Sequence, residues 1–250
     1  SSAASDVYKR QLLMRPIGFS TGALALSDFR RGLAIIRKHR LPAIELSALR
    51  DSELFPLLDS IEGLDLSDFV HVAVHAPSRF EVLSEQQVAQ ALQRSVPSSW
   101  PIIVHPDVLE NDDLWQQFGP RLCIENMDKR KPIGRTVVEL ERVFRRFSNA
   151  TLCYDIGHAR QIDPTMGVAR DILIHFGSRL QQVHISEVNA RSGHEAISFT
   201  AAQAFRTVAH LIPEDVPIIH EGVFGEDLVE NQIQVAANAL TPIQSSVSRK

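Results

Sequence analysis

Cysteine, excess positive charge and long hydrophobic runs are all scarce in this sequence, and each shortage excludes a class of protein. The 250 residues include only two cysteines, Cys123 and Cys153. These are too few for a disulfide framework, so we expect both to be reduced thiols in the core. Lys and Arg number 26 against 30 Asp and Glu, a formal net charge of −4. Because no dominant block of positive charge is available to follow a phosphate backbone, nucleic acid is disfavoured as a partner.

The sequence also lacks membrane-spanning segments and several common cofactor and catalytic motifs. No apolar run approaches the ~18 to 20 residues that cross a bilayer, and the first residues, SSAASDVYKRQLLM, lack the apolar centre of a signal peptide. We therefore expect a cytoplasmic protein with no membrane partner. The sequence has no G-x-G-x-x-G after a strand, no G-x-x-x-x-G-K-S/T, no H-E-x-x-H and no G-x-S-x-G. These absences argue against a nucleotide cofactor, a zincin site and a serine hydrolase.

What the sequence does contain is the composition of one globular domain. Hydrophobic residues make up 44% and charged residues 22% of the chain, which is enough apolar material for a sizeable core. Residues 1–13 are rich in Ser and Ala and precede Met14, and we expect them to be a non-native or disordered extension. We expect one domain over residues 14–240 and a frayed tail over residues 241–250.

Short β-branched and apolar segments recur eight times along that domain. They are Pro16–Ser20, Ala43–Ser47, Val70–His75, Ile102–His105, Leu122–Glu125, Thr151–Asp155, Gln182–Ser186 and Val216–His220. Most start about 20 to 35 residues after the one before, which leaves room for one helix and two loops in each gap. Helical patterns occupy Ser27–Ile36, Ser84–Arg94, Arg135–Phe147, Val168–Phe176, Thr200–Leu211 and Asp227–Leu240, and we expect shorter helices after the second and fourth strands. Eight β-then-α units predict an α/β protein, a single-domain (β/α)₈ TIM barrel.

Potential metal ligands stand at the ends of six consecutive predicted strands. They are His75, His105, Glu125, Asp155, His184 and the pair His220 and Glu221. Active sites of (β/α)₈ barrels are built at these C-terminal strand ends. Taken singly, a strand-end His is more often a surface or core residue, and an Asp is more often the N-cap of the next helix. Together, so many carboxylates and imidazoles would repel one another and be poorly solvated unless a cation neutralised them.

The donor types narrow the choice of ion. Carboxylate and imidazole ligands without thiolates suit Mn²⁺, Mg²⁺, Co²⁺ or Zn²⁺ and argue against a cysteine-rich structural zinc site. Cys123 and Cys153 lie two residues before Glu125 and Asp155, so strand alternation places them on the same inward face, one layer deeper. We therefore expect the cysteines to pack in the core rather than bind metal.

Segments at these strand ends resemble the xylose isomerase-like TIM-barrel superfamily, which includes sugar isomerases and epimerases, enzymes of the inosose dehydratase type, and endonuclease IV. The segments are IENMD, YDIGHA, HISEVNARSGH and HEG, with weaker matches at HAP and VHP, and the resemblance spans about residues 16 to 240. In the ketose 3-epimerase branch, one divalent ion, commonly Mn²⁺, is held by residues that correspond to Glu125, Asp155, His184 and Glu221. The resemblance implies that Glu125 and Glu221 also form an acid and base pair on opposite faces of the substrate carbon.

The same resemblance suggests residues that bind substrate. His158 corresponds to a residue that contacts substrate oxygens near the metal. Arg191 corresponds to a basic residue that grips hydroxyl or phosphate groups, although a solvated loop charge is equally expected. The residues predicted to bind substrate also include His75, His105 and His194. Residues 129–131, Lys-Arg-Lys, favour an anionic substrate such as a sugar phosphate or an acid sugar, or else form an ordinary solvated face.

We therefore predict a divalent-metal-dependent sugar, sugar phosphate or polyol isomerase or epimerase that transfers a proton next to a carbonyl. The partner would be a small-molecule sugar or sugar phosphate, and a homo-oligomer is expected on the resemblance alone. The first alternative is an endonuclease IV-like phosphodiesterase on abasic DNA, whose three-zinc site would use His75, His105 and His194; that family has an Asp where this chain has Ser192. The second alternative is a non-catalytic metal-binding barrel, against which the intact Glu125 and Glu221 count.

Overall fold

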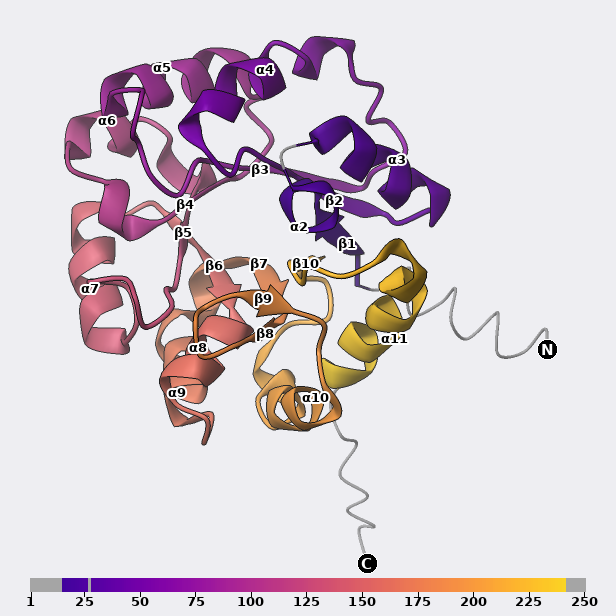
Figure 1. Ribbon diagram of the computed structural model, residues 1–250. Helices are drawn as coiled ribbons and strands as arrows, with labels where there is room; N and C mark the ends of the chain where they lie inside the picture. Colours follow the sequence, from indigo (N-terminus) through magenta and orange to yellow (C-terminus); the bar gives the residue numbers. More distant parts are fainter. Residues whose placement is uncertain (1–14, 27, 242–250) are drawn as a thin grey trace, which may run out of the picture.

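Eight parallel strands close into a barrel in the computed structural model, which describes residues 15–26 and 28–241 (Figure 1). The strands are β1 (Ile17–Ser20), β2 (Ala43–Ser47), β3 (His71–His75), β4 (Ile102–Val104), β5 (Leu122–Glu125), β6 (Thr151–Asp155), β7 (Leu180–Ile185) and β10 (Ile218–His220). Each predicted strand overlaps one of these. Their order around the barrel is β1-β10-β7-β6-β5-β4-β3-β2, so the predicted (β/α)₈ barrel of the α/β class is confirmed.

The register of the barrel brings the ends of neighbouring strands to similar levels. Glu125 pairs with Cys153, and Asp155 pairs with His184. The barrel closes where Phe19 of β1 pairs with His220 of β10. Because all these strands run parallel, their C-terminal residues open onto one mouth of the barrel, where side chains from strands far apart in the sequence meet.

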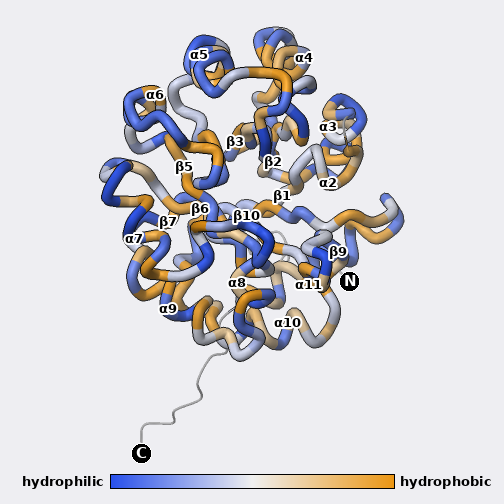
Figure 2. Tube along the Cα trace, turned by 60° about the vertical axis from the view of Figure 1, so that its left-hand side comes forward, coloured by the Kyte–Doolittle hydropathy of each residue, from blue (hydrophilic) through white to orange (hydrophobic). Residues whose placement is uncertain are grey.

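Helices surround the barrel (Figure 1). They are α2 (Thr21–Ala25), α3 (Phe29–Lys38), α4 (Leu54–Leu58), α5 (Glu85–Ser95), α6 (Asp112–Gln116), α7 (Val137–Arg146), α8 (Ile156–Ile162), α9 (Gly167–Phe176), α10 (Phe199–Arg206) and α11 (Val229–Ala239). The six predicted helices correspond to α3, α5, α7, α9, α10 and α11, and α4 and α6 are short, as expected. Figure 2 shows hydrophilic and hydrophobic residues alternating around the outer helices, which is typical of helices with one face on a core.

Side-chain caps begin some of these helices, and short 3₁₀ turns lie in the connections between elements. The Ser84 hydroxyl accepts a hydrogen bond from the Gln87 backbone N–H at the start of α5, and Thr136 caps α7 in the same way. The connections contain short 3₁₀ turns: η1 (Asp51–Glu53), η2 (Ile61–Gly63), η3 (Pro106–Val108), η4 (Gly119–Arg121), η5 (Gly177–Arg179), η6 (Ala209–Leu211) and η7 (Glu226–Leu228).

Two helices and one hairpin were not predicted. Helices α2 and α8 begin directly after β1 and β6, and an antiparallel hairpin of β8 (Glu187–Val188) and β9 (His194–Glu195) follows β7. Helix α8 is too short to show the amphipathic period of the longer helices. Gly157 in its first turn permits a close approach, because a Cβ there would lie 2.4 Å from the carbonyl oxygen of Ser186. Helix α8 carries His158, and strand β9 of the hairpin carries His194.

The core has two parts. Between the barrel and the helices, a large apolar layer includes the fully buried Trp115 and Tyr154. A separate small cluster consists of Ala73, Ile103, Cys123 and Cys153 from four neighbouring strands. Both cysteines are buried free thiols, so the prediction that they pack in the core is confirmed.

Some predictions concern parts of the chain that the structure does not describe. The expected extension over residues 1–13 and residues 242–250 of the expected tail lie outside the described residues. Within residues 15–26 and 28–241, no helix has both the length and the apolar character needed to cross a membrane.

Candidate metal centre

Glu125, the last residue of β5, lies at the centre of the barrel mouth. Its side chain is 1% exposed, and its two oxygens face different histidines. Oε2 lies 3.2 Å from Nε2 of His75 and 3.1 Å from Nε2 of His105. Oε1 lies 3.3 Å from Nδ1 of His184 and 3.3 Å from Nδ1 of His158. Glu125 therefore joins separate groups of possible ligands, as a carboxylate between two metal ions does.

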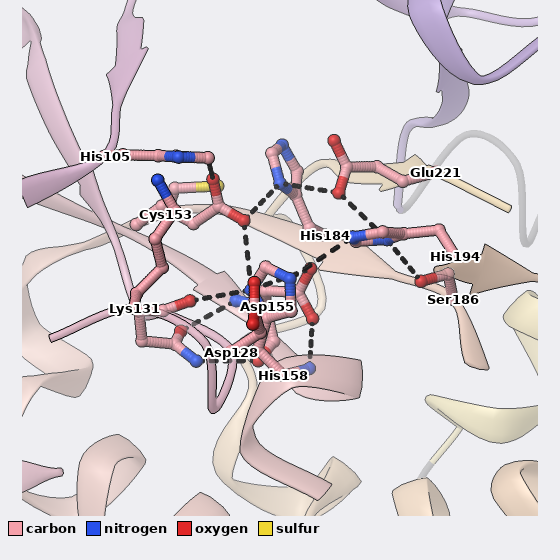
Figure 3. Close-up of polar contacts among 12 residues, drawn as sticks. His105, Asp128, Lys131, Cys153, Asp155, His158, His184, Ser186, His194 and Glu221 are labelled. Carbon is pink, nitrogen blue, oxygen red and sulfur yellow. Dashed lines mark hydrogen bonds and ion pairs between the residues drawn. The ribbon is translucent and has the colours of Figure 1, made fainter. Parts of the chain in front are cut away.

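The first group consists of the four residues predicted as metal ligands. Glu125, Asp155, His184 and Glu221 each offer one donor atom, and these atoms lie within 4.8 Å of one another. Figure 3 shows Asp155, His184 and Glu221 close together, with a contact between His184 Nδ1 and Glu221 Oε2 of 3.3 Å. The structure thus brings together four residues that the sequence placed at successive strand ends. We call them the four-residue group.

Asp155 is fully buried, but only one of its two carboxylate oxygens accepts a hydrogen bond from a described residue. Its Oδ1 accepts a hydrogen bond from the backbone N–H of His158, 2.6 Å away, and so caps α8. Its Oδ2 has no hydrogen-bond partner among the described residues. Burial raises the pKa of Asp155 well above its usual value, and the Glu125 and Glu221 carboxylates add to the rise. A cation beside Oδ2 would supply the missing partner, so Asp155 suits both the predicted helix cap and a metal site.

A second group adds His75 and His105 to Glu125, again with donor atoms within 4.8 Å of one another. Nδ1 of His75 donates to the carbonyl oxygen of Ala76, 2.6 Å away, which directs Nε2 toward Glu125. Burial alone would lower the pKa of His75, but the hydrogen bond to Glu125 and nearby carboxylates raise it to about 9. His75 and His105, which were predicted to bind substrate, are therefore also placed as possible ligands of a second ion.

A third group contains Asp155, His158 and His194, whose donor atoms also lie within 4.8 Å of one another. Nε2 of His158 lies 3.2 Å from Nε2 of His194. The other ring nitrogens have partners of their own: Nδ1 of His158 lies 2.9 Å from the carbonyl oxygen of Asn126, and Nδ1 of His194 lies 2.8 Å from Ser186 Oγ. The two Nε2 atoms therefore face each other, whereas Nδ1 of His158 also lies 3.5 Å from Asp155 Oδ2 and Nδ1 of His194 lies 3.6 Å from Glu221 Oε2.

The hairpin loop after β8 contains two further residues that the resemblance singled out. Ser192, which stands where endonuclease IV has an Asp, is buried with a positive φ of 58°. Its hydroxyl hydrogen bonds with the side chain of Gln161, so among the described residues the third group has Asp155 as its carboxylate. Arg191 is exposed, and its backbone N–H donates to Asn189 Oδ1 at 2.8 Å.

Carboxylates and imidazoles at the mouth compensate one another. Burial opposes the ionisation of Glu221, yet His184 and His194 lower its pKa to about 2. Burial likewise opposes the ionisation of Glu125, but His184 and His105 hold its pKa well below the usual value. Burial would lower the pKa of His184, whereas the surrounding negative groups raise it well above its usual value. A bound cation would replace these imidazolium protons, because metal ligands must be deprotonated.

A pocket of about 400 Å³ opens onto these groups. Its lining includes His75, His105, Glu125, His158, His194 and Glu221, and also the cations Arg79, Arg130 and Lys131. Lys131 Nζ lies 2.8 Å from Asp107 Oδ2, and Arg130 Nε lies 3.1 Å from Asp128 Oδ1. Arg79 is exposed and forms no ion pair with any described residue. Arg191 does not contribute to this lining, so its role in binding substrate stays a prediction.

Glu45, in the middle of β2, is a residue of the site that the sequence patterns did not reveal. Its side chain is fully buried. Its Oε2 lies 2.8 Å from Nε2 of His184 and 2.7 Å from Nε2 of Gln182. The available signal was a Glu within the otherwise apolar segment AIEL, because Glu is rarely buried without a partner.

The known proteins that resemble this chain in structure are distant from it in sequence. No protein-family model and no curated protein matches it. Among solved structures, 3-keto-D-glucoside 4-epimerase from E. coli, in its apo form, gives a TM-score of 0.59 at 11% identity, over 90% of this chain and 98% of that one. A proposed sugar phosphate isomerase/epimerase from Anabaena variabilis gives 0.56 at 12% identity, over 88% of each chain. Endonuclease IV from Thermus thermophilus gives 0.53 at 16% identity, over 90% and 98%. The chain therefore shares the fold of these proteins, a (β/α)₈ barrel, as the resemblance predicted.

Proposed function

We propose that this chain is a divalent-metal-dependent isomerase or epimerase of a small sugar that carries an anionic group, acting by proton transfer next to a carbonyl. The placement of Glu125 and Glu221 carries the proposal. One oxygen of each lies 3.3 Å from Nδ1 of His184, and both residues line the pocket. Two carboxylates therefore approach one ligand site from different strands. The names of two of the similar structures, a sugar epimerase and a proposed sugar phosphate isomerase/epimerase, support this choice.

The four-residue group would hold one divalent ion. Its nitrogen and oxygen donors suit Mn²⁺, the expected ion, and are also compatible with Co²⁺, Mg²⁺ or Zn²⁺. When bound, the ion supplies a Lewis acid for the carbonyl oxygen of the substrate. Glu221 would accept the proton, because its side chain is 14% exposed toward the pocket and its low pKa keeps it ionised. On the other side of the reacting carbon, Glu125 would pass on a proton taken from His75, whose Nε2 lies 3.2 Å from Glu125 Oε2 and whose pKa is raised to about 9.

Three cations in the pocket lining favour a substrate with negative charge. Arg130 and Lys131 are already paired with Asp128 and Asp107. Arg79 is therefore the cation best able to bind a phosphate or carboxylate group of the substrate. A pocket of about 400 Å³ has the size expected for a small molecule.

A second candidate is cleavage of a phosphodiester, the reaction expected from the resemblance to endonuclease IV. One observation favours it: Glu125 connects His75 and His105 to the four-residue group, and Asp155 connects His158 and His194. Centres with two or more ions are well suited to displacement at phosphorus. The net charge of −4 counts against this candidate, because DNA binding depends on positive surface charge.

Counting the bound ions and following the substrates in one preparation separates the two candidates. Protein stripped with chelator is titrated with Mn²⁺, Co²⁺ and Zn²⁺ by calorimetry. It is then incubated in D₂O with neutral and phosphorylated ketoses and, separately, with DNA containing an abasic site. One ion per chain and deuterium next to the ketose carbonyl, both lost in Glu221→Gln, would support the isomerase or epimerase. Two or three ions with DNA cleavage and no deuterium exchange would favour the second candidate instead.

A further inference from the structure

A fully buried carboxylate contacts the metal centre from inside the barrel. Glu45 projects from β2, and it belongs to none of the ligand groups formed by the described residues. Its Oε2 lies 2.8 Å from Nε2 of His184. Nδ1 of the same ring lies 3.3 Å from both Glu125 and Glu221. The His184 ring therefore lies between Glu45 and the carboxylates of Glu125 and Glu221, with Nε2 toward Glu45 and Nδ1 toward the other two.

Glu45 is itself held in place by a second polar residue. Nε2 of Gln182 donates to Oε2 of Glu45 at 2.7 Å, and Oε1 of Gln182 lies 2.7 Å from Nε2 of His71. The amide of Gln182 thus has an acceptor at one end and a donor at the other, which fixes its orientation. Both contacts of Glu45 converge on Oε2, while Oε1 has no partner among the described residues. The Glu45 oxygen that faces His184 is therefore the same oxygen that Gln182 holds by a hydrogen bond.

A carboxylate in this position changes what His184 can do as a ligand. When Nε2 of an imidazole donates its proton to a carboxylate, the tautomer and the ring orientation are fixed and the other nitrogen becomes a stronger ligand. In His184 that other nitrogen is Nδ1, which faces the four-residue group. A buried carboxylate costs free energy unless it is paired, so a purely space-filling role at this position would be better served by an apolar residue.

We propose that Glu45 is a positioning residue of the metal centre, which holds His184 with Nδ1 toward the ion and strengthens it as a ligand. Gln182 in turn holds Glu45 in the orientation that this role requires. The inference rests on the metal centre of the proposed function and deepens it. It extends the centre from the strand ends into the interior of the barrel, by way of β2.

Two substitutions separate the charge of Glu45 from its hydrogen bonds. Glu45→Gln keeps an acceptor oxygen for His184 and Gln182 but removes the charge, whereas Glu45→Leu removes both. Glu85→Gln is a matched control, because Glu85 is also a hydrogen-bonded carboxylate, 2.7 Å from Trp115 Nε1, but contacts no residue of the ligand groups. Thermal unfolding of the metal-free proteins establishes that each variant is folded. Calorimetry then gives the affinity for Mn²⁺ and Zn²⁺, and NMR of the zinc-loaded, ¹⁵N-histidine-labelled protein follows the Nε2–H group of His184.

We expect Glu45→Leu to bind the ions about 10- to 100-fold more weakly than the wild type, Glu45→Gln to lose a smaller part of the affinity, and Glu85→Gln to be unchanged. The His184 Nε2–H signal should persist in the wild type and be lost or shifted in Glu45→Leu. Equal affinity and an unchanged signal in a folded Glu45→Leu would overturn the inference while leaving the proposed function intact. If that variant does not fold, the same result in Glu45→Gln would overturn it. A wild type that binds no divalent ion would overturn both proposals.

Discussion

Nε2 of His158 lies 3.2 Å from Nε2 of His194. Two unprotonated ring nitrogens would repel each other at this distance, so one of them must carry a proton. Nδ1 of His158 donates to the carbonyl oxygen of Asn126, which leaves Nε2 of a neutral His158 as an acceptor. His194 is then the donor through Nε2, and its Nδ1 accepts from the Ser186 hydroxyl. The two rings therefore form an ordered chain of hydrogen bonds along the pocket wall, which a substrate hydroxyl could join.

Replacing His194 should weaken substrate binding and spare the ion. His194 lies outside the four-residue group, with which its own group shares only Asp155. We expect His194→Ala to raise the KM for the ketose about tenfold, as the loss of one hydrogen bond predicts, with the same number of Mn²⁺ ions bound per chain. Steady-state kinetics and calorimetry on the same preparation test this. A fall in the number of ions bound per chain would instead identify His194 as a ligand and favour the second candidate.

Metal binding should release protons, because the pKa values of two of the proposed ligands are raised in the metal-free protein. Burial opposes the charge on His184, but nearby negative groups raise its pKa well above the usual value, and burial raises the pKa of Asp155. Any proton on either group must leave before that group can ligate the ion. The affinity for Mn²⁺ should therefore rise from about pH 6 to 8, by about tenfold per pH unit for each proton released. Calorimetry in buffers of different ionisation enthalpy counts these protons, and a pH-independent affinity would contradict the assigned ligands.

Arg79 should distinguish anionic from neutral substrates. It lines the pocket and forms no ion pair with any described residue, so a substrate phosphate would gain a charge-assisted hydrogen bond there. We expect Arg79→Ala to raise the KM for a phosphorylated ketose about tenfold and to leave a neutral ketose unaffected. Arg191→Ala is the matched control, because Arg191 is exposed and absent from the lining. A larger effect of Arg191→Ala would show that the hairpin loop, rather than Arg79, binds the anion.

The barrel and the position of the candidate ligands at strand ends could be predicted from the sequence because both follow from single strands, and the resemblance then singled out the four-residue group. Eight apolar segments identify the strands, and the last residue of each lies at the mouth whatever its neighbours are. Glu125, Asp155 and His184 could therefore be assigned to one site before any contact between them was known. Their common position depends only on the strands being parallel.

Contacts that cross the barrel could not be predicted in this way. Glu45 and His184 are 139 positions apart, and they meet only because the closed barrel turns the side chains of β2 and β7 toward one interior. Arg191 shows that a sequence motif likewise does not reveal where a side chain lies in a folded loop. The motif around it resembles one that grips substrate, but its backbone N–H is tied to Asn189 and Ser192 turns with a positive φ. In that hairpin the Arg191 side chain is exposed, which the motif alone does not reveal.

Asp51 ties the loop after β3 to the first turn of η1. Its Oδ2 accepts hydrogen bonds from the backbone N–H groups of Glu81, Val82 and Leu83 at 2.7, 2.5 and 2.8 Å. Burial alone would raise the pKa of Asp51, but these hydrogen bonds lower it below the usual value. The same loop carries Arg79 to the pocket lining, so Asp51 contributes to both stability and the shape of the pocket.

The acid dependence of stability should therefore include a contribution from Asp51. A carboxyl group whose pKa is lower in the folded state stabilises fully above its unfolded pKa of about 3.9, and this stability is lost as the pH falls through the folded pKa. We expect Asp51→Ala to reduce the free energy of unfolding at pH 7 by about 2 kcal/mol, since it removes hydrogen bonds to a charged acceptor. The difference from the wild type should shrink below about pH 4. Urea unfolding at a series of pH values measures both effects. A constant difference down to the lowest pH would show that packing, rather than the ionised carboxylate, accounts for the loss.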